Sequence, residues 1–465
     1  MLFSSLEFLF IFLPLLCIPY IWVKNIRFRN CILIIFSLIF YAFGEPKAVV
    51  LMLASIIVNY TFALLITRFK NMSKILLVVS VIFNLAFLFW YKYTGFFISN
   101  VNNIFSLNIE IPVIHLPIGI SFFTFQAMSY VIDVYRKDTD VQKNPFYLLL
   151  YICLFPQLIA GPIIKYHDIA SQIDKRETNW NTYINGSRIF LFGLFKKVLI
   201  ANSCGMLWES ILNSDILAIS VATAWIGAIF YAFQIYFDFS GYSDMAIGLG
   251  KIFGFDFLAN FNYPYISRSI REFWRRWHIS LSTWFKEYLY IPLGGNRKGS
   301  LRTYINLLIV FFCTGFWHGA SWNFIIWGMW HGFFSVAERF FLGKMLDNTR
   351  YKIINHIYTL SVVVIGFAIF AITDSTQLIL YLKAMFGLNG NGLFDNNFLF
   401  ILINNLVIIF TAVLLSTPIY IYMRERLPRS KMMNFVYGAI YIALFIVVIA
   451  NLVGASYNPF LYFRF

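Results

Sequence analysis

Two histidines and an asparagine interrupt a run of 35 residues that contains no Asp, Glu, Lys or Arg. His318, Asn323 and His331 all lie within this run, residues 303–337. Polar side chains in so apolar a segment are costly, and they are retained mainly where they serve a function. Since an imidazole titrates near neutral pH and can remove a hydroxyl proton, we expect His331 to be a general base in a group-transfer reaction.

The spacing of the two histidines sets a condition on the helix that carries them. Thirteen residues at about 100° each place His318 and His331 roughly 220° apart around a straight helix, so the two cannot share one face. Either Gly315 or Gly319 breaks the helix near His318, or only one histidine faces the site.

Asn323, Trp327 and His331 follow one another at intervals of four residues and therefore share a helical face. Asn323 or His318 would then orient the imidazole or polarise a developing negative charge. Two alternatives remain open, because Asn323 also suits a hydrogen bond between helices and His318 also suits a helix end.

A zinc site formed by His278, His318 and His331 is a further alternative. No His-Glu-x-x-His pattern and no Cys/His cluster accompanies these residues, so we expect no metal. The five cysteines form no Cys-x-x-Cys pair and are expected to be free thiols.

A basic segment precedes the charge-free run. The 35 residues that begin at Arg268 carry eight basic and two acidic side chains. Arg268, Arg271 and Arg275 have helical spacing, which predicts one amphipathic cytosolic helix over 266–290. Guanidinium groups bind phosphate in a bidentate manner, so Arg271, Arg275 and Arg276 are expected to hold a donor such as coenzyme A or a phosphopantetheine-bearing carrier. The simpler alternative is a loop that follows the positive-inside rule.

Other polar residues predict irregular helices. The segment from Asp238 to Asp244 places a glycine and two acids in an apolar stretch, which is typical of a broken or re-entrant helix or of hydrogen-bond clamps between helices. Pro156 and the Gly161-Pro162 pair predict a kink or half-helix in their own segment.

The elements that position these side chains must lie in lipid. Of the 465 residues, 60% are hydrophobic and 12% are charged, the net charge is +15, and the mean hydropathy is +0.73. A soluble protein cannot bury so much apolar surface, so we predict an all-α polytopic membrane protein with about 11–12 transmembrane helices. Nucleic acid is not an expected partner, because a chain embedded in lipid offers no extended basic face.

Several long motifs in this order resemble the bacterial membrane-bound O-acyltransferases, particularly their alginate O-acetyltransferase branch. The motifs that carry the resemblance are Leu116–Phe125, Leu154–Pro162, Tyr236–Asp244, Arg271–Ser282, Tyr290–Asn296, Phe316–Gly319 and Asn458–Phe465.

The resemblance implies one membrane domain over residues 1–465, in which helices form a funnel or tunnel. Its parts would be N-terminal helices in 1–110, a catalytic core in 111–345 and C-terminal helices in 346–465. It also implies that His331 is the catalytic histidine, with His318 in the same signature.

By the same resemblance, His278 would lie near the cytosolic entrance and would help Arg271, Arg275 and Arg276 to bind the donor. His331 would act as base or carry the acyl group transiently. No cofactor would be bound permanently, because the acyl donor would be acetyl-coenzyme A or another acyl thioester.

The expected function is O-acylation, most simply O-acetylation, of an extracytoplasmic polysaccharide by a multi-pass protein of the bacterial cytoplasmic membrane. A separate extracytoplasmic acyltransferase is an expected partner. Two other functions remain open: D-alanyl transfer to teichoic acid from a carrier-protein thioester, and a transporter or channel for glycan or acyl donor.

Overall fold

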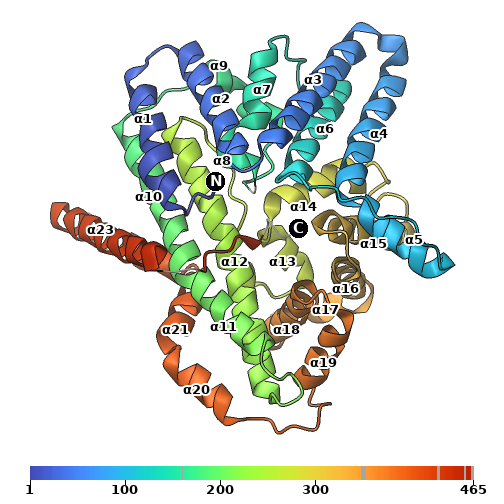
Figure 1. The fold of residues 1–465 in the computed structure, drawn as a ribbon, viewed down its shortest axis with the longest axis vertical. Helices are drawn as coiled ribbons and strands as arrows, with labels where there is room; N and C mark the ends of the chain where they lie inside the picture. Colours follow the sequence, from blue (N-terminus) through green and yellow to red (C-terminus); the bar gives the residue numbers. More distant parts are fainter. Residues whose placement is uncertain (160, 347–351, 427–429, 455–456, 462–465) are drawn as a thin grey trace. The chain divides into compact units, whose positions relative to one another are not determined.

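The structure is a computed structural model that describes residues 1–159, 161–346, 352–426, 430–454 and 457–461 (Figure 1). Every regular element in these ranges is a helix, so the predicted all-α class is confirmed. The last four residues of the motif Asn458–Phe465 lie outside the described residues. The chain divides into two compact units, which are described separately below.

Unit 1 consists of Met1–Phe190 and Tyr242–Leu258. Its helices are η1 (Phe8–Phe12), α1 (Leu13–Trp22), α2 (Ile26–Ala42), α3 (Pro46–Arg68), η2 (Lys70–Met72), α4 (Ser73–Lys92), α5 (Thr94–Phe105), α6 (Ile120–Arg136), α7 (Pro145–Cys153), α8 (Phe155–Leu158), α9 (Tyr166–Asp174) and most of α10 (Trp180–Phe195). The end of α12 (Val221–Ile252) also belongs to this unit. Helix α3 packs against both α4 and α6 (Figure 1). The predicted break near Pro156 is confirmed, because α7 ends at Cys153 and only the four-residue α8 follows.

Unit 2 consists of Leu191–Gly241 and the described residues from Ala259 onward, and it contains all of the residues that the sequence predicts for the site. Its helices up to the site are η3 (Lys196–Ala201), α11 (Asn202–Leu212), α12 (Val221–Ile252, shared with unit 1), η4 (Pro264–Ile266), α13 (Ile270–Arg276), α14 (Ile279–Phe285), η5 (Lys286–Tyr290), α15 (Ser300–His318), α16 (Trp322–Ala337) and η6 (Glu338–Leu342). Those that follow are α17 (Gly343–Leu346), α18 (Lys352–Ala371), α19 (Ser375–Met385), α20 (Asn396–Asn404), α21 (Leu406–Leu415), α22 (Ile419–Arg426) and α23 (Lys431–Gly454).

The number of helices that can cross a membrane alone is smaller than the predicted 11–12. By length and composition, the described residues contain seven such helices, or eight if α20 and α21, bent by 66°, form one span. The reason is that several apolar runs are not single long helices. Residues 111–119 are not helical, and the run 303–337 is divided into two helices. Hydropathy detects apolar residues and cannot detect where the backbone turns.

The division of 303–337 occurs at Gly319, which is one of the two positions predicted. Helix α15 ends at His318, Gly319 is extended, and α16 begins at Trp322. The two helices then pack closely through glycines: a Cβ at Gly315 would lie 2.3 Å from the carbonyl oxygen of Phe324, and one at Gly328 would lie 2.3 Å from that of Phe311. Small residues at such positions allow helix backbones to approach each other in membranes.

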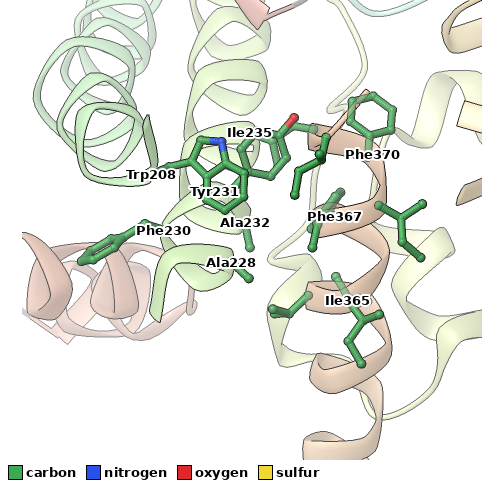
Figure 2. Packing of buried hydrophobic residues seen from close by; sticks show 14 of the residues in the cluster. Trp208, Ala228, Phe230, Tyr231, Ala232, Ile235, Ile365, Phe367 and Phe370 are labelled. Atoms are coloured by element: carbon green, nitrogen blue, oxygen red, sulfur yellow. The ribbon is translucent and has the colours of Figure 1, made fainter. Parts of the chain in front are cut away.

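The apolar core of unit 2 lies between α12 and α18, with α11 at its side. Figure 2 shows Trp208, Tyr231 and Ile235 together with Phe367 and Phe370, all of which are buried. Side chains of α11, α12 and α18 therefore pack together in this core. The last turn of α18 approaches the histidines described below.

Helix α12 is continuous through Asp238 and Gly241, so the first of the two alternatives for this stretch, a broken or re-entrant helix, is not what the structure shows. The alternative, a clamp between elements, describes the structure. The carboxylate of Asp238 lies 2.7 Å from Nζ of Lys197 in η3 and accepts the backbone N–H of Leu461 (2.9 Å). Lys197 also donates to Asn202 and to the carbonyl oxygen of Pro459. Because these buried polar groups are paired with one another, α12 can remain helical at Asp238.

Candidate active site

His331 lies in the third turn of α16 and its side chain is fully buried (0% exposed). Its ring is stacked on Phe273 (6.1 Å between centroids, 7° between planes) and meets Trp274 and Trp327 edge-on, each at 5.2 Å. Neither ring nitrogen has a hydrogen-bond partner among the described residues. Buried polar atoms are nearly always paired, so an imidazole with both nitrogens uncommitted is typical of a functional site.

His318 lies at the end of α15, and its ring contacts the same Trp327 ring that His331 contacts. The centroids of His318 and Trp327 are 5.0 Å apart, and Phe370 of α18 meets His318 at 5.4 Å. Because the helix breaks at Gly319, the two histidines contact the same indole ring although their spacing forbids a shared face on one straight helix. His318 is also a helix end, as one of the two readings predicted.

His278 is buried (1% exposed) in a left-handed conformation (φ 43°) just before α14. Its Nδ1 lies 3.3 Å from Oδ1 of Asn260, and its ring is 6.2 Å from that of Trp317, which in turn meets His318 at 5.1 Å. Trp317 thus contacts both His278 and His318, and Trp327 contacts both His318 and His331. Within the described ranges no group of three or more His, Cys, Asp or Glu side chains could hold a metal ion.

Asn323 ties α16 to α18. Its Nδ2 donates to the carbonyl oxygen of Phe370 (2.9 Å) and more weakly to that of Ile369 (3.5 Å). The last carbonyl groups of a helix lack partners within the helix, and the asparagine amide supplies one here. This geometry matches the alternative of a hydrogen bond between helices. The Oδ1 atom has no hydrogen-bond partner in the described part of the chain.

A cavity of about 370 Å³ lies in unit 2 beside His331 and is lined by residues of α13, α14, η5, α15, α16 and η6. Its basic residues are Arg271, Arg275, Lys286 and Arg339. Trp274 also lines the cavity, and its ring contacts the ring of His331 as well as those of Phe311 and Trp327. The indole of Trp274 therefore connects the basic cavity to the buried imidazole.

The predicted single helix over 266–290 was wrong. The segment forms α13 and α14, which are separated by Trp277 and His278, and η5 follows α14 directly. Ser269 is the N-cap of α13, since its hydroxyl accepts the backbone N–H of Glu272 (3.0 Å). Arg268 therefore precedes the helix and does not share a face with Arg271 and Arg275.

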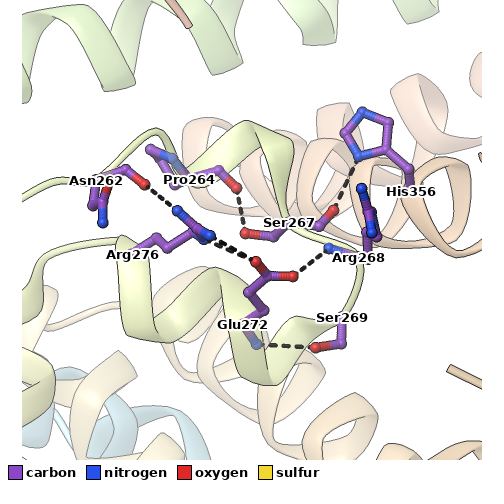
Figure 3. A network of polar contacts seen from close by, with 8 residues as sticks. All are labelled: Asn262, Pro264, Ser267, Arg268, Ser269, Glu272, Arg276 and His356. Carbon is purple, nitrogen blue, oxygen red and sulfur yellow. Dashed lines mark hydrogen bonds and ion pairs between the residues drawn. The ribbon is translucent and has the colours of Figure 1, made fainter. Parts of the chain in front are cut away.

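Arg276 does not line the cavity that Arg271 and Arg275 line. Figure 3 shows its guanidinium group bound to Glu272 (Nε to Oε1, 2.9 Å) and to the carbonyl oxygen of Asn262 (3.1 Å). The other carboxylate oxygen of Glu272 accepts the backbone N–H of Arg268 (2.9 Å). The sequence contains a signal for this pairing, because Glu272 and Arg276 are four residues apart on one helix.

Two cavity residues that follow His331 in the chain were not identified as site residues by the sequence analysis. Arg339 lines it from η6, and Ser335 lies one turn after His331 on α16. Their signal is periodicity, since positions four and eight residues after His331 continue its helical face. Arg339 lies just beyond the charge-free run 303–337, so a search within that run could not include it.

The chain is similar to several known proteins along most of its length. Residues 120–382 match the family model of the membrane-bound O-acyltransferases. A probable alginate O-acetylase of Pseudomonas putida is 37% identical over 100% of both chains. The peptidoglycan O-acetyltransferase of Helicobacter pylori is 38% identical over 84% of this chain and 80% of its own. The teichoic acid D-alanyltransferase of Bacillus subtilis is 28% identical over 55% of this chain and 68% of its own.

Proposed function

Since this chain belongs to the membrane-bound O-acyltransferase family and is a multi-pass membrane acyltransferase, we propose that it transfers an acetyl group from a cytosolic thioester toward an extracytoplasmic polysaccharide. The observation that supports this most is His331, which is fully buried, has two uncommitted ring nitrogens and contacts Trp274 in the wall of a basic cavity.

The proposed step needs one base in a dry site. One ring nitrogen of His331 removes the proton of the acceptor hydroxyl while the hydroxyl oxygen attacks the thioester carbonyl. The C–S bond then breaks, and the departing thiolate takes the proton back from the imidazolium. His318 and Trp327 orient the ring by packing, and Asn323 holds α16 against α18.

A second form of the step has His331 carry the acetyl group transiently. Incubation with labelled donor but no acceptor distinguishes the two. A base leaves the protein unlabelled, whereas an acyl carrier gives a labelled protein whose label is lost in His331→Ala.

The basic cavity is the proposed binding place of the donor. Arg271, Arg275, Lys286 and Arg339 bring four positive charges to a cavity that also has apolar walls. Coenzyme A and phosphopantetheine both combine phosphate groups with a long thiol arm, which suits such a lining. Arg276, already bound to Glu272, is not proposed to touch the donor. His278 is proposed to support Trp317 and not to contact phosphate, because it is buried.

The proposed acceptor is a cell-envelope polysaccharide, in line with two relatives whose names specify alginate and peptidoglycan. A separate extracytoplasmic acyltransferase is proposed to complete delivery to the polymer. D-alanyl transfer is the second candidate, because a teichoic acid D-alanyltransferase aligns with about half of the chain. Acetyl-coenzyme A and a D-alanyl carrier protein, each offered as sole donor, separate the two candidates.

The test compares wild type, His331→Ala and His115→Ala at equal membrane abundance. His115 is a suitable control, because its side chain is 80% exposed and pairs with Glu45 in unit 1. We expect transfer of labelled acetyl groups to glycan to be lost in His331→Ala and retained in His115→Ala. Normal ester content in His331→Ala would refute the assignment of the base.

A further inference from the structure

Glu338 is a fully buried acid (0% exposed) at the start of η6, directly after α16. Its carboxylate accepts two backbone N–H groups of α13: Oε1 from Ile270 at 2.5 Å and Oε2 from Arg271 at 3.1 Å. A buried carboxylate is retained only where it is well paired, and hydrogen bonds to a charged acceptor are the stronger kind. Both oxygens of Glu338 are thus used to attach the first turn of α13.

Glu338 and His331 are seven residues apart and lie on the same face of one continuous helical stretch. Both contact α13. Glu338 binds its first residues, and His331 packs on Phe273 and Trp274 in the middle. Helix α13 is therefore held against α16 at two points about 10 Å apart along the axis.

The short helix α13 carries the groups that the proposed donor would meet. Arg271, Trp274 and Arg275 all line the basic cavity. Among the described residues, the other side-chain hydrogen bonds of α13 are made within the helix or with the segment that precedes it, as in the pairs Glu272–Arg276, Glu272–Arg268 and Arg276–Asn262. Those bonds stabilise the helix without fixing where it lies on α16, whereas the bonds to Glu338 do both.

We propose that Glu338 is a positioning residue for the acyl donor: it holds α13 where Arg271 and Arg275 can reach the donor's phosphate groups and Trp274 lies against His331. This inference rests on the proposed function, because it concerns binding of the same donor. Glu338 itself touches neither donor nor acceptor. It acts through the backbone of α13.

The test uses the full-length protein in detergent or vesicles, with acetyl-coenzyme A as donor. Glu338→Gln keeps the size of the side chain but removes its charge, and one of the two N–H groups then faces an amide NH₂ that cannot accept. Glu338→Asp keeps the charge and shortens the reach. Asp395→Asn is the matched control, because Asp395 also accepts two backbone N–H groups, from Ser220 and Phe398, but does not line the cavity.

In Glu338→Gln we expect the donor KM to rise about tenfold while kcat changes by less than about threefold, since charge-assisted hydrogen bonds to one positioning group are lost. Glu338→Asp should recover part of the affinity. Asp395→Asn should lower the thermal unfolding midpoint and leave the donor KM unchanged. A purely structural role of Glu338 would lower the midpoint in the same way without this separation of KM from kcat.

Two results would overturn the inference. One is a wild-type donor KM in both Glu338 variants, and the other is an equal rise of KM in Asp395→Asn. If Glu338→Gln does not accumulate in the membrane, the KM of Glu338→Asp decides alone. Wild-type protein that transfers no acetyl group refutes the proposed function instead, so the two failures are distinguishable.

Discussion

Gly366 of α18 faces the catalytic candidate His331 of α16 across the helix interface. A Cβ atom at position 366 would lie only 2.9 Å from Nε2 of His331 and 3.3 Å from Cδ1 of Trp330. Such a separation is shorter than a normal contact between a methyl group and a ring nitrogen. The absence of a side chain at this glycine therefore provides the room in which the imidazole lies.

Gly366→Ala should move the imidazole without removing it. Overpacking of a well-packed site costs about 1–3 kcal/mol. Displacement of a catalytic group by about 1 Å can lower its rate by about 100-fold. We expect kcat to fall by more than about tenfold while the protein still reaches the membrane. Gly438→Ala is the control, because its Cβ would meet nothing within 4 Å in helix α23. Equal activity of the two alanine variants would contradict the predicted crowding.

Arg271 and Arg275 should differ from Arg276 in their effect on the donor. Each of the first two lines the cavity, and loss of a charged hydrogen bond to phosphate corresponds to about a tenfold higher KM. Arg276→Ala should change the donor KM by less than about twofold, because Arg276 does not line the cavity. Its ion pair with Glu272 is partly exposed and contributes little to the free energy of folding.

Initial rates against acetyl-coenzyme A concentration at low and high salt provide the measurement. The difference between wild type and Arg271→Ala should shrink as salt rises, since ions screen interactions between charges. An Arg276→Ala effect as large as that of Arg271→Ala would contradict the division of roles that the cavity indicates.

Asn323→Ala should lower the stability of the fold more strongly than it lowers kcat. Removing the amide leaves the carbonyl group of Phe370 without this donor, which costs about 1–3 kcal/mol. We expect a lower thermal midpoint and a kcat per folded molecule within about tenfold of wild type. Asn451→Ala is the control, because Asn451 donates to Val447 within its own exposed helix. A loss of kcat comparable to that of His331→Ala at an unchanged midpoint would instead identify Asn323 as a polarising group.

Lys197→Met should destabilise unit 2 strongly, because it leaves Asp238 charged and buried without its cationic partner. Breaking a buried pair in this way costs about 3–5 kcal/mol, whereas replacing both partners by apolar residues is often close to neutral. Thermal unfolding should therefore show a low midpoint for Lys197→Met and a partial recovery in Lys197→Met/Asp238→Leu. A double variant less stable than the single variant would contradict the assignment of an ion pair.

The sequence predicted the local backbone of the site better than its tertiary contacts. The break at Gly319 followed from the angle between His318 and His331 and from the local glycines, both of which are visible in one segment. Arg268 was misplaced, because helical spacing cannot show that Ser269 caps the helix after it.

The sequence left two alternatives open for Asp238, a broken helix and a clamp between helices, because its partner Lys197 lies on another element. Glu338 was not identified at all. Its role depends on a contact with α13 that no periodicity within α16 encodes. In each of these cases the missing information was a tertiary partner distant in sequence, which local propensity and pattern do not specify.

The segment Tyr457–Leu461 gives unit 2 an order of assembly during biosynthesis. Lys197 and Asp238 are translated more than two hundred residues before this segment. Until the segment is made, Asp238 lacks the N–H of Leu461 and Lys197 lacks the carbonyl group of Pro459. Because unsatisfied polar groups in an apolar environment are destabilising, the nascent protein reaches its final stability only after this late segment has docked.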